Sequence, residues 1–120
     1  MNLGIVGKKG EDLTASFLRK NGWTVIKRNY YCRFGEIDII AENDTYIIFV
    51  EVKTRRENSI VSATQAVDSF KQNKILLTAQ DFLTKYDTVL QPRFDVAEVT
   101  VSPKNDGAMG FNLNYIENAF

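Results

Sequence analysis

Apolar and polar positions along the chain predict two helices and five strands in a definite order. Leu13, Phe17 and Leu18 recur at helical spacing ahead of an Asn-Gly pair, which is typical of a helix C-terminus. Residues 46–53 (YIIFVEVK) are rich in β-branched and aromatic side chains and give the strongest strand pattern, whereas residues 62–65 (SATQ) have capping-box spacing. The pattern predicts, in order, a helix over Lys8–Lys20, strands over Trp23–Asn29, Glu36–Glu42 and Tyr46–Lys53, a helix from Ser62 to about Tyr86 with Ala63, Ala66, Val67 and Phe70 on one face, a strand over Arg93–Val101 and an edge strand over Phe111–Ile116.

This order, α-β-β-β-α-β before the edge strand, predicts an α/β fold with a mixed sheet flanked by helices. The second and third strands are expected to form a hairpin that turns at Asn43-Asp44. The helix that follows the third strand allows a right-handed parallel crossover to the fourth. We expect a single domain over residues 1–120, with its core at about 7–101 and an edge strand or a loose tail over 102–120.

Composition narrows the classes of protein that fit. The chain has 120 residues, of which 44% are hydrophobic and 25% charged, as in an ordinary globular domain. It contains no histidine, which excludes Ser-His-Asp and Cys-His catalysis and histidine-bound zinc. The single cysteine, Cys32, cannot form an internal disulfide, and no apolar run is long enough for a signal peptide or a membrane span. We therefore expect a cytoplasmic protein with no membrane contact.

Charge is balanced overall but unevenly distributed. The formal net charge is zero, with +3 over residues 1–56 and −3 over residues 57–120. A basic N-terminal half favours a nucleic-acid partner only weakly, and an ordinary solvated surface is an equally good interpretation.

Ionisable residues within the predicted sheet give the most informative chemical pattern. Alternation along the third strand places Phe49, Glu51 and Lys53 on one face. With the hairpin turning at Asn43-Asp44, Glu36 would oppose Glu51 and Asp38 would oppose Phe49. Asp38 and Glu51 would then be diagonal neighbours with backbones about 7–8 Å apart, close enough for both carboxylates to bind one cation.

A hard divalent cation such as Mg²⁺ suits this pattern, because it needs only one or two carboxylates and completes its shell with water and substrate phosphate. The carbonyl of Val52 is a candidate third ligand, and Lys53 would orient or help deprotonate an attacking water. Glu11, expected in the first turn of the first helix, would support the metal's water shell or bind a second ion.

Simpler interpretations of the same residues stay open. Glu36, Asp38, Glu51 and Lys53 could form an exposed cluster of ion pairs, each contributing about 0–1 kcal/mol. Glu11 could serve only to complement the helix dipole. The basic residues near these positions are either a phosphate-contacting rim or a solvated surface, and two neighbouring tyrosines could stack on unpaired bases or pack in the core; these residues are Lys27, Arg28, Arg33, Arg55, Arg56, Lys71 and Lys74, with Tyr30 and Tyr31.

The motifs resemble a known nuclease signature. Gly35-Glu36-Ile37-Asp38 followed by Phe49-Val50-Glu51-Val52-Lys53-Thr54-Arg55 is similar to the PD-(D/E)XK motif in the form found in the YraN family of small bacterial endonuclease-like proteins. The chain departs from the family pattern at Asn58–Ser62, where that pattern often contains glycine. The resemblance runs from about Gly7 to Val99 and extends to Gly7, Gly10-Glu11, Ala15, Leu18, Gly22, Arg28-Asn29-Tyr30, Ala66-Val67, Lys71 and Arg93-Phe94-Asp95-Val96.

The resemblance implies a restriction-endonuclease-like fold similar to that of Holliday-junction resolvases. It assigns metal binding to Asp38 and Glu51, the catalytic lysine to Lys53 and a helix acid to Glu11. We therefore expect a Mg²⁺- or Mn²⁺-dependent endonuclease acting on DNA, with branched or junction DNA as one candidate substrate. A junction-cleaving version would need two symmetrically placed sites and hence a homodimer. The alternative is a non-catalytic nucleic-acid- or protein-binding module that retains the fold.

Overall fold

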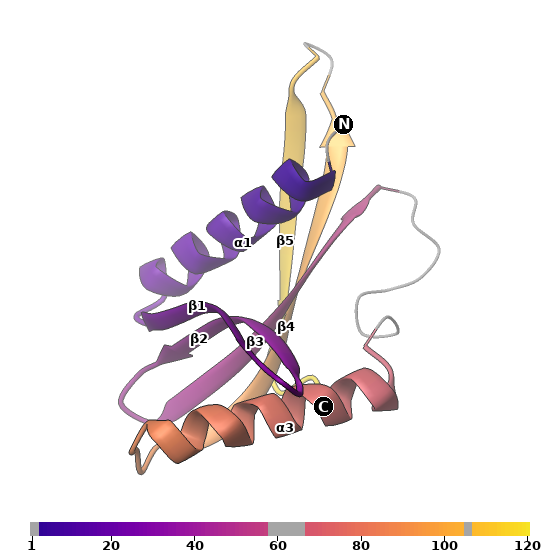
Figure 1. Ribbon diagram of the computed structural model, residues 1–120. Coiled ribbons are helices and arrows are strands. Elements are labelled where there is room, and N and C mark those ends of the chain that lie inside the picture. Colours follow the sequence, from indigo (N-terminus) through magenta and orange to yellow (C-terminus); the bar gives the residue numbers. More distant parts are fainter. Residues whose placement is uncertain (1–2, 58–66, 105–106) are drawn as a thin grey trace.

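The computed structural model describes residues 3–57, 67–104 and 107–120, which form one five-stranded sheet between two helices (Figure 1). The strand order is β1-β2-β3-β4-β5, with β3 and β4 parallel and the other neighbours antiparallel. The predicted mixed α/β fold and its parallel crossover are therefore confirmed. The elements are α1 (Leu3–Lys20), β1 (Thr24–Cys32), β2 (Gly35–Glu42), β3 (Tyr46–Arg56), α3 (Ser69–Lys85), β4 (Gln91–Pro103) and β5 (Met109–Ile116).

Each face of the sheet is covered by one helix. Ala15 and Leu18 of α1 pack with side chains of β2 and β3 such as Ile48 and Val50. On the opposite face, Ile75, Ala79 and Phe82 of α3 pack against Phe49 and its neighbours. Alternation along β3 thus supplies both cores, as the pattern of residues 46–53 predicted. Neither described helix is long and apolar enough to cross a membrane.

Helix α1 ends as predicted but begins earlier than predicted. Gly22 has a φ of +87°, and the Trp23 N–H donates to the Leu18 carbonyl at 3.0 Å, which is a glycine-terminated C-cap. The helix begins at Leu3 and not at Lys8. Its glycine-rich first half has low helix propensity, but it packs against β3: a Cβ on Gly10 would lie 2.2 Å from Thr54 Oγ1. Tertiary packing therefore outweighs propensity here.

The hairpin between β2 and β3 forms, but its register differs from the prediction by two residues. Ile39 pairs with Val50 and Ile40 with Phe49, so the predicted Asp38–Phe49 and Glu36–Glu51 pairs are wrong. Asn43 explains the shift, because its Oδ1 accepts hydrogen bonds from the N–H groups of Thr45 and Tyr46 at 2.9 and 2.7 Å and moves the turn one residue along. A register shift of two residues does not change which side chains lie on the same face of the sheet.

Helix α3 begins at Ser69, where the Asp68 carboxylate caps it by accepting from the Lys71 N–H at 2.9 Å. Val67 precedes the helix, so the predicted helix starting at Ser62 does not extend through this point. The expected capping box at residues 62–65, like the departure from the family pattern at 58–62, lies outside the described residues. Phe70 is 70% exposed and not part of the predicted apolar face.

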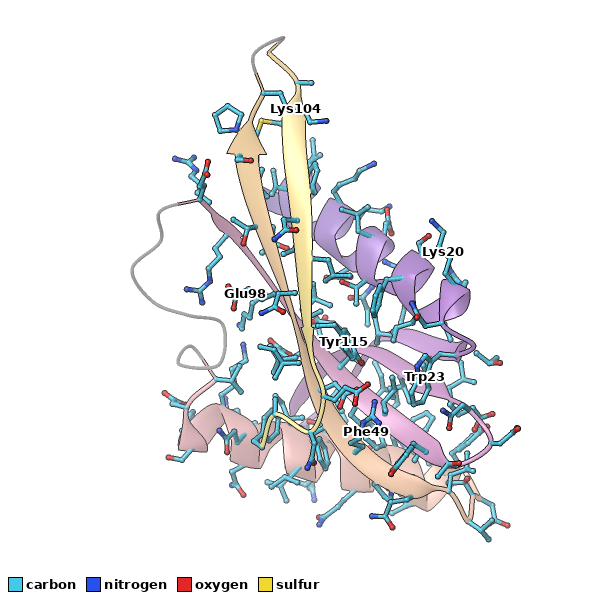
Figure 2. The ribbon with its side chains drawn as sticks, turned by 180° about the vertical axis from the view of Figure 1, so that it is seen from behind. Lys20, Trp23, Phe49, Glu98, Lys104 and Tyr115 are labelled. Atoms are coloured by element: carbon cyan, nitrogen blue, oxygen red, sulfur yellow. The ribbon has the colours of Figure 1, made fainter. Side chains whose placement is uncertain are left out.

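The predicted edge strand is confirmed, and the residues after it are packed. β4 and β5 continue together beyond the other strands to a turn at Lys104 (Figures 1 and 2). After β5, the Ala119 N–H donates to the Phe94 carbonyl, and the Phe120 ring stacks on the Phe94 ring at 5.5 Å. The alternative of a loose tail over 102–120 is therefore wrong for the described part of that segment.

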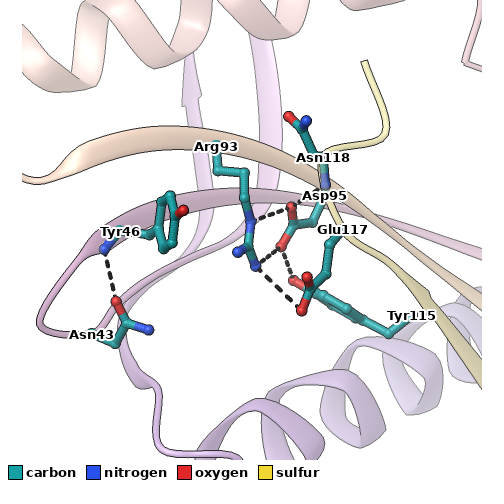
Figure 3. Close-up of polar contacts among 7 residues, drawn as sticks. All are labelled: Asn43, Tyr46, Arg93, Asp95, Tyr115, Glu117 and Asn118. Carbon is teal, nitrogen blue, oxygen red and sulfur yellow. Dashed lines mark hydrogen bonds and ion pairs between the residues drawn. The ribbon is translucent and has the colours of Figure 1, made fainter.

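A buried carboxylate holds this C-terminal segment in place (Figure 3). Asp95, 0% exposed, accepts two hydrogen bonds from the Arg93 guanidinium at 3.0 and 2.9 Å, one from the Tyr115 hydroxyl at 2.6 Å and one from the Asn118 N–H at 2.9 Å. Burial and the bond to Asp95 raise the pKa of Tyr115. The Arg93 guanidinium lies over the rings of Trp23 and Tyr46, as well as pairing with Asp95. Charge and hydrogen bonding of the carboxylate are thus satisfied by two strands and the final turn.

Candidate active site

The side chain of Asp38 points along the sheet toward β3 because β2 rotates at this residue. Regular alternation would put Ile37 and Ile39 on one face, yet Ile37 packs with α3 and Ile39 with α1. The neighbouring strand is irregular at the same level, where Asn29 has a left-handed φ of 52°. The pairing of β2 with β3 ends at Ile39, and beyond it Asp38 Oδ2 accepts a hydrogen bond from the Val52 N–H at 2.7 Å.

Glu51 and Lys53 lie on the α3 face of β3, as their alternation with Val50 and Val52 predicted. Glu51 is 8% exposed, and its Oε1 lies 3.2 Å from Lys53 Nζ and 2.8 Å from Lys71 Nζ of α3. Since the carboxylate is nearly enclosed, the interpretation of an exposed cluster of surface ion pairs is wrong for Glu51. Lys53 and Lys71 together neutralise a buried acid.

The two acids open into one hollow of about 280 Å³ between the β1–β2 turn and α3. The turn approaches the helix closely, since a Cβ on Gly35 would lie 3.6 Å from Lys74 Cβ. Glu36 also contributes to the hollow, although it was predicted only as a member of candidate ion pairs. Its spacing of two residues from Asp38 was the signal that could have found it. The described residues that line this hollow are Gly35, Glu36, Asp38, Glu51, Lys71, Lys74 and Ile75.

Burial of like charges perturbs the titration of this cluster. Burial, followed by the nearby charge of Glu51, raises the pKa of Asp38 to about 7, against the lowering effect of its bond from the Val52 N–H. Burial, followed by the contact with Lys71, lowers the pKa of Lys53. Burial acts to lower the pKa of Lys71 as well, but its contacts with Glu51 and Lys53 outweigh that effect and raise it. Shifts of this kind are frequent at functional sites.

Glu11 lies in a neighbouring hollow of about 670 Å³, lined by α1 and β1, and is absent from the described lining of the hollow that holds Asp38 and Glu51. It is far from the first turn of α1, which contains no acid, so the helix-dipole interpretation is wrong. Arg28 lies 3.8 Å from Glu11 and 2.8 Å from Asp12. Burial raises the pKa of Glu11 while Arg28 opposes the rise, and the charge of Glu11 contributes to the raised pKa of Asp38.

The structure brings together only part of the expected basic rim. Lys71 and Lys74 line the hollow, whereas the Arg33 guanidinium lies 4.7 Å from the centre of the Phe34 ring. Arg55 and Arg56 follow Lys53 toward the end of β3, half-buried and exposed respectively. The two tyrosines of β1 divide: Tyr30 packs its ring against Phe82 and bonds Asp81, whereas Tyr31 is exposed.

The available donor set suits a hard cation with few protein ligands. Within residues 3–57, 67–104 and 107–120, no group of three or more His, Cys, Asp or Glu side chains is arranged to hold a metal ion. Asp38 and Glu51 supply two carboxylates beside one hollow. Val52, between Glu51 and Lys53 in β3, has a backbone carbonyl that is the candidate third ligand. Two carboxylates and a carbonyl fit Mg²⁺, which keeps several water ligands, better than zinc.

The sheet and its flanking helices define an α/β protein with a restriction-endonuclease-like arrangement. Within that class, the chain belongs to the uncharacterised protein family UPF0102, whose sequence pattern matches residues 10–99. It is 41% identical over 121 residues to a UPF0102 protein of Dictyoglomus turgidum, covering 100% of both chains. It is 39% identical over 121 residues to a relative in Caldanaerobacter subterraneus subsp. tengcongensis, covering 100% of this chain and 98% of the relative. The expected family membership is confirmed, whereas these names state no activity and leave the nuclease-like superfamily a prediction.

Proposed function

We propose that this protein is a cytoplasmic, divalent-metal-dependent phosphodiesterase that cleaves nucleic acid internally, with DNA as its substrate and Mg²⁺ or Mn²⁺ as its cofactor. The observation that carries the proposal is the shared hollow of Asp38 and Glu51, with Asp38 fixed on the backbone N–H of Val52. A buried Glu51 beside a half-buried Asp38, whose pKa is raised to about 7, is a costly arrangement for a purely structural protein. A bound cation would remove that cost.

Asp38 and Glu51, the two acids to which the motif resemblance assigns metal binding, would hold the ion. The Val52 carbonyl, next to Glu51 in β3, would be a third ligand. Glu51 pairs through Oε1 with both Lys53 and Lys71, so a cation bound at Glu51 would share this carboxylate with two ammonium groups. When bound, the ion supplies positive charge at the attacked phosphate and makes a water molecule more acidic.

The lysines provide the remaining chemistry. Lys53 follows Glu51 on the same face of β3, and its lowered pKa favours donation or acceptance of a proton close to neutral pH more than an ordinary lysine does. We assign it the orientation of the attacking water. Lys71 lies on the opposite wall, where its ammonium stabilises negative charge on the phosphate. Glu11 enters the proposal only through its charge, which raises the pKa of Asp38.

Cleavage assays with single-stranded, duplex and four-way-junction DNA, each with Mg²⁺ and with Mn²⁺, test the proposal. We expect cleavage that is abolished by Asp38→Asn and by Glu51→Gln and that needs the metal. Asp44→Asn is the matched control, because Asp44 is an exposed acid in the turn at the other end of β2. Cleavage that survives Asp38→Asn would assign the activity to a contaminant. Junction cleavage should coincide with a homodimer, which sedimentation in the presence of DNA would detect.

A non-catalytic binding module is the second candidate, favoured by the full neutralisation of Glu51 by two lysines and by the zero net charge. Calorimetry with Mn²⁺ separates the candidates. The nuclease proposal predicts a binding isotherm that Asp38→Asn and Glu51→Gln remove. Absence of an isotherm in the parent protein, with DNA present, favours the binding module.

A further inference from the structure

A large aromatic side chain is exposed beside the candidate active site. Phe70, in the first turn of α3, is 70% exposed, and its apolar ring has no hydrogen-bonding group that would explain its contact with water. A single exposed apolar side chain is ordinary on a protein surface, but a ring that lines a hollow together with two lysines offers a flat apolar face to a ligand.

The ring belongs to a hollow that adjoins the one containing the two acids. This second hollow, of about 340 Å³, is lined by Asp68, Phe70, Lys71 and Lys74 among the described residues. Lys71 and Lys74 line both hollows. A path therefore leads from Glu51, 2.8 Å from Lys71 Nζ, to Lys74, whose Nζ lies 4.8 Å from the centre of the Phe70 ring.

We propose that Phe70 is a stacking platform for an unpaired nucleobase whose flanking phosphates are held by Lys71 and Lys74. The choice of nucleic acid as ligand rests on the proposed function. In a paired duplex, each base is covered on both faces by its neighbours, so a protein ring can stack only on a base that has left the stack. Phenylalanine also offers no hydrogen bond that reads base identity. The site thus selects single-stranded or branched nucleic acid over continuous duplex, without sequence preference.

Charge around the ring supports this occupant over a second copy of the chain. Of the described residues that line the hollow, two are lysines and one is an acid, Asp68, whose carboxylate accepts from the Lys71 N–H as the helix cap. An anionic ligand with an aromatic group satisfies both the lysines and the ring, whereas self-association through Phe70 would bring the lysines of two copies together.

Binding without cleavage tests the proposal independently of the nuclease chemistry. In metal-free buffer, fluorescence anisotropy compares an oligothymidylate with an abasic oligomer of equal length, which has the same phosphates but no bases. We expect the parent to bind the oligothymidylate roughly five- to hundredfold more tightly. Phe70→Ala should erase this ratio while leaving the abasic affinity unchanged, and Phe70→Trp should retain it. Leu76→Ala, which removes a 40% exposed side chain of the same helix that lines neither hollow, is the control.

Three outcomes would overturn the stacking platform: equal affinity of the parent for the two oligomers, an unchanged ratio in Phe70→Ala, or a change in that variant's self-association alone, measured by sedimentation. Its failure is separable from failure of the nuclease proposal. A Phe70-dependent base preference without metal-dependent cleavage would support stacking and contradict the nuclease. Metal-dependent cleavage that does not depend on Phe70 or on whether the DNA is single- or double-stranded would support the nuclease and contradict stacking.

Discussion

Asp38→Asn should stabilise the protein at neutral and alkaline pH, because the substitution removes a charge that partial burial and the nearby Glu51 disfavour. Asparagine is nearly isosteric with aspartate, and its Oδ1 can still accept the hydrogen bond that the Val52 N–H donates at 2.7 Å. The variant therefore removes the charge facing Glu51 while keeping the backbone contact.

The magnitude follows from the two pKa values of Asp38. The ordinary value is 3.8, and burial together with Glu51 raises it to about 7 in the folded protein. Between these values the folded state binds the proton more tightly than the unfolded state, so the free energy of unfolding falls as pH rises, and the loss is complete above about pH 7. Three pKa units correspond to about 4 kcal/mol, and because Glu51 shares the titration we expect about 2–4 kcal/mol.

Urea denaturation in metal-free buffer at several pH values measures this effect. Asp38→Asn should exceed the parent in stability by the stated amount at pH 8 and match it near pH 4, whereas the exposed-turn control Asp44→Asn should follow the parent throughout. Mn²⁺ at pH 8 should raise the midpoint of the parent and not that of Asp38→Asn. A difference between variant and parent that is independent of pH, or a variant that is less stable at pH 8, would refute the reasoning.

Three further changes test other parts of the structure. Asp95→Ala should lower the free energy of unfolding by about 3–5 kcal/mol in urea, because it leaves the Arg93 guanidinium without its buried partner; a loss below 1 kcal/mol would contradict this. Gly10→Ala should cost about 1–3 kcal/mol because its Cβ would lie 2.2 Å from Thr54 Oγ1, and Thr54→Ala should restore most of the loss in a double-mutant cycle. Lys53→Met should reduce any metal-dependent cleavage at least about a hundredfold without weakening Mn²⁺ binding in calorimetry, since Lys53 is assigned to the water and its loss removes a positive charge beside Glu51.

Local patterns predicted the faces of the sheet but not the register that joins them. The alternation of Phe49, Glu51 and Lys53 with Val50 and Val52 is a period-two signal within one strand, so it survives any even shift of the partner. The register depends on Asn43, because the hydrogen bonds that its side chain accepts fix the turn at one of the two positions that the residue pattern allows. The face of Glu51 and Lys53 was therefore predicted correctly, whereas the residues that oppose them on β2 were not.

The orientation of Asp38 could not be predicted from β2 alone. It depends on the left-handed backbone of Asn29 in β1 and on the end of the pairing between β2 and β3 at Ile39. Phe70 was assigned to an apolar helix face because helical spacing does not report where a helix begins, and α3 starts only one residue before it. Periodicity within one helix or strand therefore predicts wrongly the orientation of side chains that depend on a neighbouring element or on where their own element begins.

The hydrogen bonds that Asp95 accepts also affect how the edge of the sheet fluctuates. An outermost strand ordinarily opens and closes far more often than the interior, and its amide hydrogens exchange with solvent accordingly. Here, detaching the end of β5 would withdraw the Tyr115 hydroxyl and the Asn118 N–H from a carboxylate that has no access to water. Detachment of the end of β5 is therefore coupled to loss of the whole fold. The amide hydrogens at the end of β5 should exchange as slowly as those of the central strands.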